Sequence, residues 1–239
     1  MTHSSESIIS LERKSLSDQL FTHIRGMIFS QELKGGEGIP EEKIARIFGV
    51  SRTPIRETLR ELEKYGLVKI NPRSQATVVE IVPEEALYIG EVRRVIETLA
   101  AKILAKKATL EDIESLKEID KKCIGAVKGG DSVEAFEVDG FFHLEIAKRC
   151  GNPYIYSILR NLEAKIQLIR IMNCSLKNML SDVKIHARLI EAIASHDSKA
   201  ASSLMQEHIG DFIRHASPGN IGHRRASAEK SKSLSLSNS

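Results

Sequence analysis

The sequence predicts a mainly α-helical protein, in which a small N-terminal domain ending in a β-hairpin precedes a larger all-α bundle. Residues 1–80 contain three short helical patterns followed by two apolar runs typical of strands. From residue 84 to residue 216 the apolar positions follow a helical period almost without interruption, as in a helical bundle. The tail, residues 217–239, is rich in serine and poor in apolar residues, so we expect it to be disordered.

The helices of the first domain follow from apolar spacing and from helix-breaking residues. Apolar residues recur every four positions from Leu16, which predicts a helix over about residues 15–33. "KGGEGIP" ends that helix, and a short second helix is expected to follow Pro40, because proline is tolerated in a first helical turn. After the turn at "GV", Ser51 is a good N-cap for a third helix.

The third helix carries Arg52, Arg56 and Arg60 on a face different from its apolar stripe. After it, "LVKI" and "ATVVE" alternate around "NPRSQ" and predict a hairpin. This order is that of a winged helix-turn-helix, whose third helix enters the DNA major groove, where arginine pairs with guanine. A solvated surface, salt-bridged by the interleaved glutamates, is the alternative. The order of the elements favours DNA binding.

The second domain is expected to contain six helices, joined to the first domain by the linker "EIVPE" at residues 80–84. Thr109 with Asp112 forms a capping-box pattern, and Asp131 suits an N-cap. The expected helices span residues 84–107, 110–128, 132–150, 154–173, 177–196 and 198–216.

Four polar residues occupy positions where the helical period predicts apolar side chains: Asp139, His143, His186 and His208. Asp139 and His143 are one turn apart, so a single helix presents both. Three imidazoles and a carboxylate suit a divalent transition metal such as Zn²⁺, Ni²⁺ or Mn²⁺, with one or two positions left open. Each histidine alone is more often a satisfied core residue, but three on the inner faces of one bundle favour a metal site.

Arg93 also faces inward, on a row with Ile89 and Ile96. A buried arginine needs an anion. Glu97, one turn later, is one such anion. The other is the carboxylate of a bound ligand, which arginine grips through two parallel hydrogen bonds.

The composition argues against several classes of protein. Cys123, Cys150 and Cys174 form no C-x-x-C pair, which argues against a disulfide framework and against a cysteine-built zinc site. No run approaches the roughly 20 apolar residues of a membrane span, and the start lacks an apolar signal core, so we expect a cytoplasmic protein without membrane contact. The net charge of +3 is too small to indicate nucleic-acid binding, so that prediction rests on local pattern.

Over roughly residues 15–216 the chain resembles the GntR family of bacterial transcription regulators, in its FadR-like branch. In the first domain the resemblance rests on "GVSRTPIRETLRELEKYGLV". It implies that Arg52, Thr53 and Arg56 are the principal DNA contacts, and we expect Ser51 and Arg60 to take part. The hairpin departs from the family pattern, because "PRSQAT" stands where the usual wing carries a glycine at its tip.

In the second domain the resemblance rests on "EVRRVIETLAAKILA", "DGFFHLEIAKRCGN" and "IHARLIEAIASHDSKAASSLMQEHI". It implies an effector-binding domain of the FCD type, in which Asp139, His143, His186 and His208 hold a metal. Arg93 would then contact an organic-acid effector.

We therefore expect a homodimeric transcription regulator, a repressor rather than an enzyme, that binds operator DNA. It would sense a small carboxylate metabolite through a metal-containing pocket. One alternative is a regulator for which the metal ion itself is the signal. Another is a metal-dependent enzyme acting on small organic acids, which is disfavoured because the sequence places no inward glutamate or further histidine as a general base.

Overall fold

The computed structural model describes residues 15–72, 74–173 and 176–216. Helices dominate these ranges, which confirms the predicted fold class. The chain folds into two compact units. Unit one comprises the chain up to Lys64 together with Val68–Val78, and unit two comprises Tyr65–Leu67 and the chain from Val79 onward. The tail predicted to be disordered lies outside the described residues.

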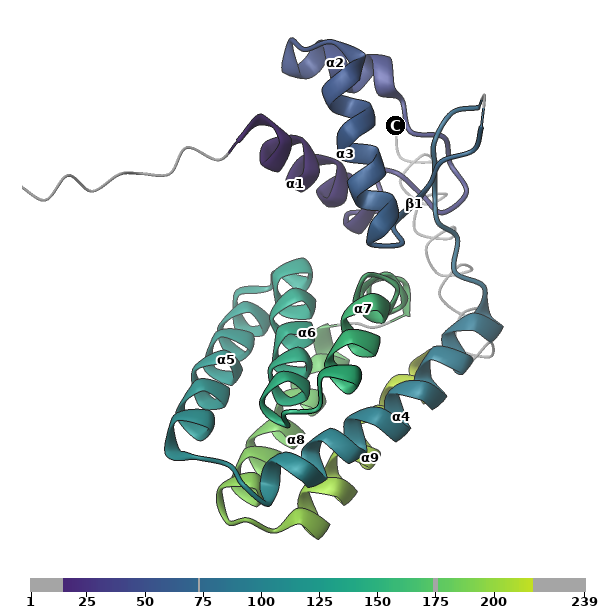
Figure 1. Cartoon of the computed structure of the whole chain (residues 1–239). Coiled ribbons are helices and arrows are strands. Elements are labelled where there is room, and N and C mark those ends of the chain that lie inside the picture. Colours follow the sequence, from purple (N-terminus) through teal and green to yellow (C-terminus); the bar gives the residue numbers. More distant parts are fainter. Residues whose placement is uncertain (1–14, 73, 174–175, 217–239) are drawn as a thin grey trace, which may run out of the picture. The chain divides into compact units, whose positions relative to one another are not determined.

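Within its described residues, unit one contains three helices and a two-stranded antiparallel sheet, in the predicted order (Figure 1). Their bounds are α1 Leu16–Phe29, α2 Glu41–Phe48, α3 Arg52–Lys64, β1 Val68–Lys69 and β2 Thr77–Val78.

Helix α1 begins at a capping box and ends earlier than expected. The Ser15 hydroxyl accepts a hydrogen bond from the Asp18 amide at 3.1 Å, and the Asp18 carboxylate accepts one from the Ser15 amide at 3.1 Å. The helix stops at Phe29 because the chain turns at Gln31, whose φ is +61°. The prediction that the helix continues to Leu33 is therefore wrong. Leu33 is buried, but it lies in the turn that follows the helix.

The hairpin is shorter than the two apolar runs suggest. Val68 pairs with Val78 and Lys69 with Thr77, and the strands extend no further in the described residues. On its other side β2 meets the segment before α2, where the Ile39 amide donates to the Ala76 carbonyl at 2.7 Å. Near the tip, the Gln75 side-chain amide donates to the Ile39 carbonyl at 2.5 Å. The Gln75 side chain thus links the hairpin to the segment that precedes α2.

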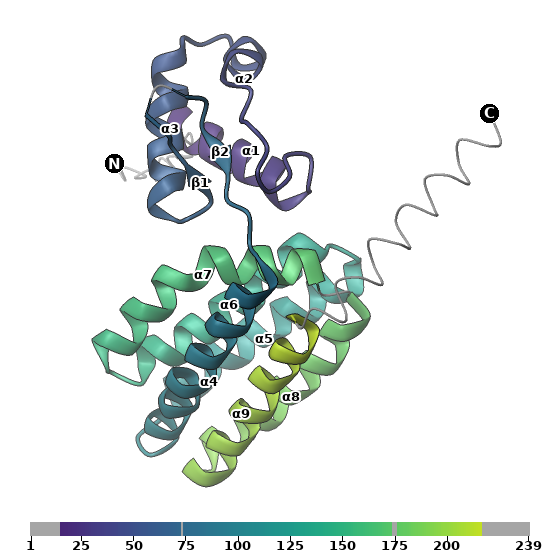
Figure 2. The same ribbon diagram turned by 90° about the vertical axis from the view of Figure 1, so that its right-hand side faces the viewer.

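Unit two is a bundle of helices α4 to α9, whose bounds agree with the expected ones within a few residues. Helix α4 packs along α9, α5 packs on α6 and α8, and α6 also packs on α7 (Figure 2). The bounds are α4 Pro83–Ala105, α5 Leu110–Gly129, α6 Ser132–Arg149, α7 Pro153–Asn173, α8 Leu176–Ala194 and α9 Ser198–Ala216.

Helix α6 packs against α4, α5 and α7, and it buries both apolar and ionisable side chains. It starts at Asp131, whose carboxylate accepts a hydrogen bond from the Glu134 amide at 2.9 Å. Asp139 and His143 are buried on the same helix as the apolar Phe136. The helix therefore carries two ionisable groups into an apolar interior.

Two further sequence expectations concern the thiols and the membrane. Cys123 and Cys150 are buried thiols, whereas Cys174 lies outside the described residues. None of the helices in the described ranges has the length and apolar character that crossing a bilayer requires.

Candidate DNA-contacting surface and candidate metal centre

Helix α3 separates a buried apolar stripe from an exposed basic face. Ile55, Leu59 and Leu62 are at most 1% exposed and fix the helix against the core of unit one. The residues predicted to contact DNA are all exposed, namely Ser51, Arg52, Thr53, Arg56 and Arg60.

Two of these arginines pair with glutamates of α2. Arg52 Nη2 lies 3.1 Å from Glu42 Oε2, and Arg56 Nε lies 3.1 Å from Glu41 Oε2. The arginine side chains remain 58% and 65% exposed, so both stay accessible to another partner. The sequence interpretation considered only the glutamates of α3 as partners. One of those, Glu63, instead accepts a hydrogen bond from the Ile70 amide at 2.8 Å.

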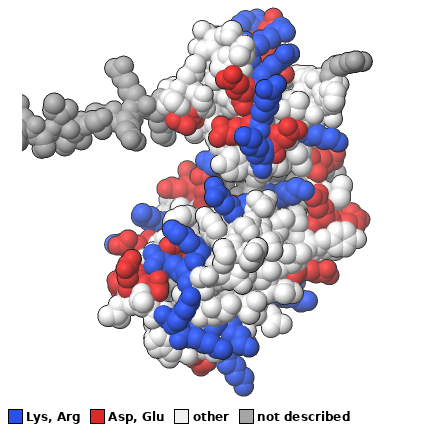
Figure 3. Space-filling view, viewed as in Figure 1, with Lys and Arg blue, Asp and Glu red and all other residues white. Residues whose placement is uncertain are grey.

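A groove of about 850 Å³ runs between α2, α3 and the hairpin. In the space-filling view, basic side chains follow α2 and α3 with acidic ones beside them (Figure 3). Among the described residues, the acidic Glu41 and Glu42 line the groove together with a larger number of basic residues: Lys43, Arg46, Arg52, Arg56 and Arg60. Such a concave basic surface beside an exposed helix suits the backbone and base edges of duplex DNA.

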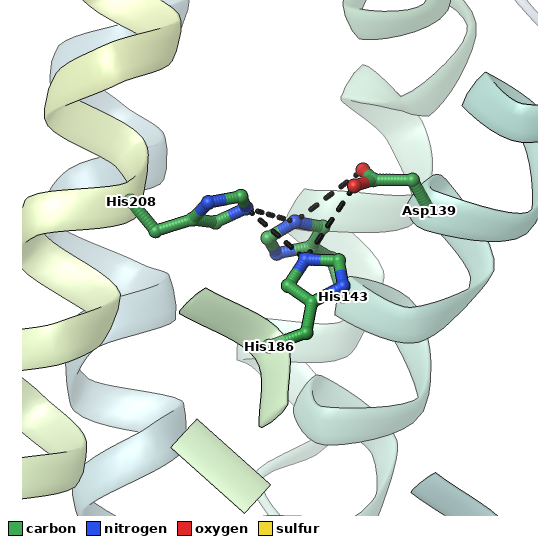
Figure 4. Close-up of side chains that lie close together, drawn as sticks. All are labelled: Asp139, His143, His186 and His208. Carbon is green, nitrogen blue, oxygen red and sulfur yellow. Dashed lines mark hydrogen bonds and ion pairs between the residues drawn. The ribbon is translucent and has the colours of Figure 1, made fainter. Parts of the chain in front are cut away.

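The four predicted metal ligands meet inside unit two (Figure 4). Asp139 and His143 come from α6, His186 from α8 and His208 from α9, and each is at most 2% exposed. His208 Nε2 lies 3.0 Å from His143 Nε2 and 3.4 Å from His186 Nε2. The Asp139 carboxylate oxygens lie 3.5 Å from the Nε2 atoms of His143 and His186.

These spacings fit a tetrahedral ion. Ligand atoms bound at about 2.0–2.2 Å in a tetrahedron lie about 3.3–3.6 Å from one another. The four potential ligand atoms all lie within 4.8 Å of one another, and neighbouring atoms are separated by 3.0–3.5 Å. Three imidazole nitrogens and one carboxylate oxygen are also a donor set that a divalent transition metal prefers. The side chains present therefore fit a metal ion.

Carboxylates lie behind two of the imidazoles. His143 Nδ1 lies 2.5 Å from Glu97 Oε2, and His186 Nδ1 lies 3.4 Å from Asp120 Oδ1. Such partners orient an imidazole so that its Nε2 faces the metal. The sequence interpretation missed Asp120. Its one signal was a charged residue on the buried stripe of α5, beside Ile119 and Cys123.

The protonation states suit metal binding, since a metal needs neutral imidazoles. Burial lowers the pKa of His186 to about 4, although Asp120 opposes the shift, and burial also lowers the pKa of His208 well below its ordinary value. Burial alone would raise the pKa of Glu97, but Arg93 and His143 outweigh it and bring that pKa to about 2. At neutral pH the centre therefore combines two neutral imidazoles, those of His186 and His208, with an ionised outer carboxylate, that of Glu97.

Two buried arginines flank the centre. Arg93 is 1% exposed, and its Nε lies 2.6 Å from Glu97 Oε1. Glu97 is the protein partner that the sequence suggested. Arg170, on α7, contacts Asp139, and its Nη2 lies 3.5 Å from His143 Nε2. Both guanidinium groups lie over the ring of Phe212, at 4.4 and 5.9 Å from its centroid. Arg170 was not predicted, although it is a charge within the apolar run "KIQLIRIM".

Family models match both units. The model described as bacterial regulatory proteins, gntR family, matches residues 16–78, and the FCD domain model matches residues 88–211. The chain belongs to the GntR family of bacterial transcription regulators. The resemblance inferred from the sequence motifs is thereby confirmed, as is the combination of a helix-turn-helix domain with an FCD domain.

Curated relatives of this GntR-family regulator are regulators too. It is 27% identical to the HTH-type transcriptional regulator YdhC of Bacillus subtilis, over 82% of this chain and 89% of that protein. It is also 27% identical to the gluconate operon transcriptional repressor of Bacillus licheniformis, over 84% of this chain and 85% of that protein. Among solved structures, Escherichia coli McbR/YncC shares the fold, with a TM-score of 0.70, 21% identity, and coverage of 85% of this chain and 98% of that chain.

Proposed function

We propose that this regulator is a ligand-responsive repressor that senses a small organic acid at a metal ion held by Asp139, His143, His186 and His208. The observation that carries the proposal is the convergence of four buried ligand atoms within 4.8 Å of one another, in a chain that also exposes an arginine-bearing helix. The relative named as a repressor of the gluconate operon supports repression of genes for the use of an acid.

The DNA contacts would come from the exposed face of α3. Arg56 would pair with a guanine, with Arg52 and Thr53 beside it and Ser51 and Arg60 at the ends of the contact. Exchanging the ion pairs between α3 and α2 for contacts with DNA would cost little free energy, because exposed ion pairs contribute about 1 kcal/mol or less to stability.

The ligand would bind between the metal and Arg93. A bound divalent ion supplies a Lewis-acidic positive charge that attracts a carboxylate. Arg93 would contribute a second positive group, while Phe212 keeps both guanidinium groups in place and Glu97 keeps His143 oriented. A ligand gripped in this way shifts the regulator only by preferring one arrangement of the protein over another.

A homodimer is supported by an apolar stripe on α4. Tyr88, Val92, Val95 and Leu99 recur at helical spacing and are 65%, 42%, 68% and 45% exposed. Figure 3 shows an uncharged surface over α4 and α7. Exposed apolar patches of this kind mark protein interfaces. Two copies would read the two halves of a pseudo-palindromic operator.

Selection of DNA from a random pool, combined with elemental analysis of the purified protein, tests the proposal. We expect enrichment of a pseudo-palindromic site and about one transition-metal ion per chain. The proposal fails if no sequence is enriched, or if the protein repeatedly purifies without metal and takes up none when metal is added. Metal-dependent DNA affinity that no acid changes would favour the ion itself as the signal.

A further inference from the structure

Beyond the four ligands and Arg93, two polar residues of α7 face the same interior. Gln167 is 5% exposed, and Glu163 precedes it by one turn. The Gln167 Nε2 donates to the Phe136 carbonyl at 2.8 Å and to Glu163 Oε1 at 2.7 Å. The pair therefore lies along α6, next to the turn that carries Asp139.

Gly140 makes this close approach to α6 feasible. A methyl group at its Cα would lie 2.4 Å from Gln167 Nε2 and also too close to the Glu163 carboxylate. Glycine costs about 1 kcal/mol relative to alanine in a helix interior. Its place in the middle of α6 is thus explained by the two polar side chains that pack against it.

The orientation of the Gln167 amide follows from its partners. The Phe136 carbonyl can only accept a hydrogen bond, so the NH₂ group must face it and the amide oxygen must face elsewhere. That oxygen is buried and has no hydrogen-bond partner among the described residues. A buried acceptor left alone is costly, and a donor from a ligand or a water molecule would relieve the cost.

A buried donor without a partner occurs in the same cluster. Arg93 uses Nε and Nη2 on Glu97, whereas its Nη1 has no hydrogen-bond partner in the part of the chain described. Glu163 lies close enough to interact electrostatically with Arg93 and Glu97. Burial raises the pKa of Glu163 most, the hydrogen bond from Gln167 and then Arg93 and His143 oppose that rise, and Glu97 adds to it. The interior thus offers a cationic donor for a carboxylate and, nearby, an acceptor for a hydrogen-bond donor.

We infer that Gln167 and Glu163 form a specificity subsite that selects hydroxycarboxylates over plain carboxylates, an inference that rests on the proposed function. The Gln167 oxygen and the Glu163 carboxylate accept hydrogen bonds from ligand hydroxyl groups, while Arg93 Nη1 donates to the ligand carboxylate. An ammonium group also donates, but Arg93, Arg170 and a metal ion would repel it. The subsite therefore binds hydroxy acids more tightly than amino acids or unsubstituted acids.

Calorimetric titration of the Zn²⁺-loaded protein tests this inference with matched acids: lactate and propionate, 3-hydroxybutyrate and butyrate, gluconate and hexanoate, with alanine as the amino acid. We expect about tenfold tighter binding of the hydroxy acid in at least one pair, since one hydrogen bond is worth roughly that factor. In Gln167→Leu the ratio falls towards one, while the affinity for the plain acid is unchanged. Gln206→Leu, at an exposed position of α9, is the matched control.

A second variant covers the case in which Gln167→Leu does not fold. Gly140→Ala pushes both subsite side chains away from α6 and favours the helix, so it should abolish the hydroxyl preference with one metal ion per chain retained. A preference that survives both variants comes from chelation of the ion and overturns the subsite. Equal binding of hydroxy and plain acids by the unaltered protein also overturns it, but leaves the proposed sensing of acids intact. If no acid binds, both proposals fail.

Discussion

The two units hold their charged groups in opposite ways. In unit one, the Arg52 and Arg56 side chains are 58% and 65% exposed and only loosely engaged by α2. In unit two, the Arg93 and Glu97 side chains are each 1% exposed and locked together. Hydrated charges exchange partners cheaply, whereas buried charges stay fixed because an unpaired one costs several kcal/mol. Exposed charge suits a surface that must release DNA, and buried charge suits a site that must distinguish small ligands.

The largest effect is expected at the buried centre. His143→Ala should lose the metal ion, as measured by elemental analysis, because it removes one of four ligands. A metal at 100 times its Kd stabilises the fold by about 2.7 kcal/mol, so a chelator should lower the Tm of the unaltered protein but not that of the variant. His23→Ala, at an exposed position of α1, is the control. Equal metal content in His143→Ala and the unaltered protein would contradict the assignment.

The next effect concerns the exposed arginines. Arg56→Ala should weaken binding to the selected DNA site by about 1–3 kcal/mol and relax specificity at one base pair, because it removes a guanine contact. Titration at fixed salt measures this loss. Arg94→Ala, at an exposed position of α4, should leave the affinity unchanged. Unchanged specificity in Arg56→Ala would place the base contact elsewhere on α3.

A smaller loss is expected from the carboxylate behind His186. Asp120→Asn should weaken metal binding about 10- to 100-fold, as removal of outer partners of metal-bound histidines does. Competition with a chelator of known affinity measures the change. Glu118→Gln, exposed on the same helix, is the control. Metal affinity within twofold of the unaltered protein would show that Asp120 has no part in orienting His186.

The smallest effect is expected at the exposed ion pair of unit one. Glu42→Gln should change DNA affinity by less than about 1 kcal/mol, because its pair with Arg52 is largely hydrated. The change should be a gain, since the substitution removes a negative charge beside the DNA phosphates, and raised salt should reduce it. A tenfold loss would mean that Glu42 positions Arg52 for DNA.

Local sequence signals predicted much of this structure. The bounds of α4 to α9 follow from apolar period, and the convergence of Asp139, His143, His186 and His208 follows from polar residues on buried stripes. Each signal lies within one helix, where the spacing of 3.6 residues per turn fixes which side chains face inward.

Contacts between elements were harder to predict. Arg56 pairs with Glu41, which lies 15 residues earlier on the other side of a turn. The apolar spacing within α2 or α3 does not predict this contact between the two helices. Arg170 was missed for a similar reason, because its partner Asp139 belongs to another helix. The end of α1 was misplaced because Leu33 follows Phe29 by four residues and is buried, as a residue in one more helical turn would be. Leu33 instead lies in the turn after the helix.

The central claim is that an acid bound at the buried metal centre changes the hold of the exposed arginine helix on DNA. The most direct measurement is the affinity for the selected site with and without hydroxy acids, for metal-loaded protein and for protein stripped of metal. The account predicts that at least one acid changes the affinity of the loaded protein about tenfold and leaves the stripped protein unaffected. Identical DNA affinity under all four conditions would contradict it.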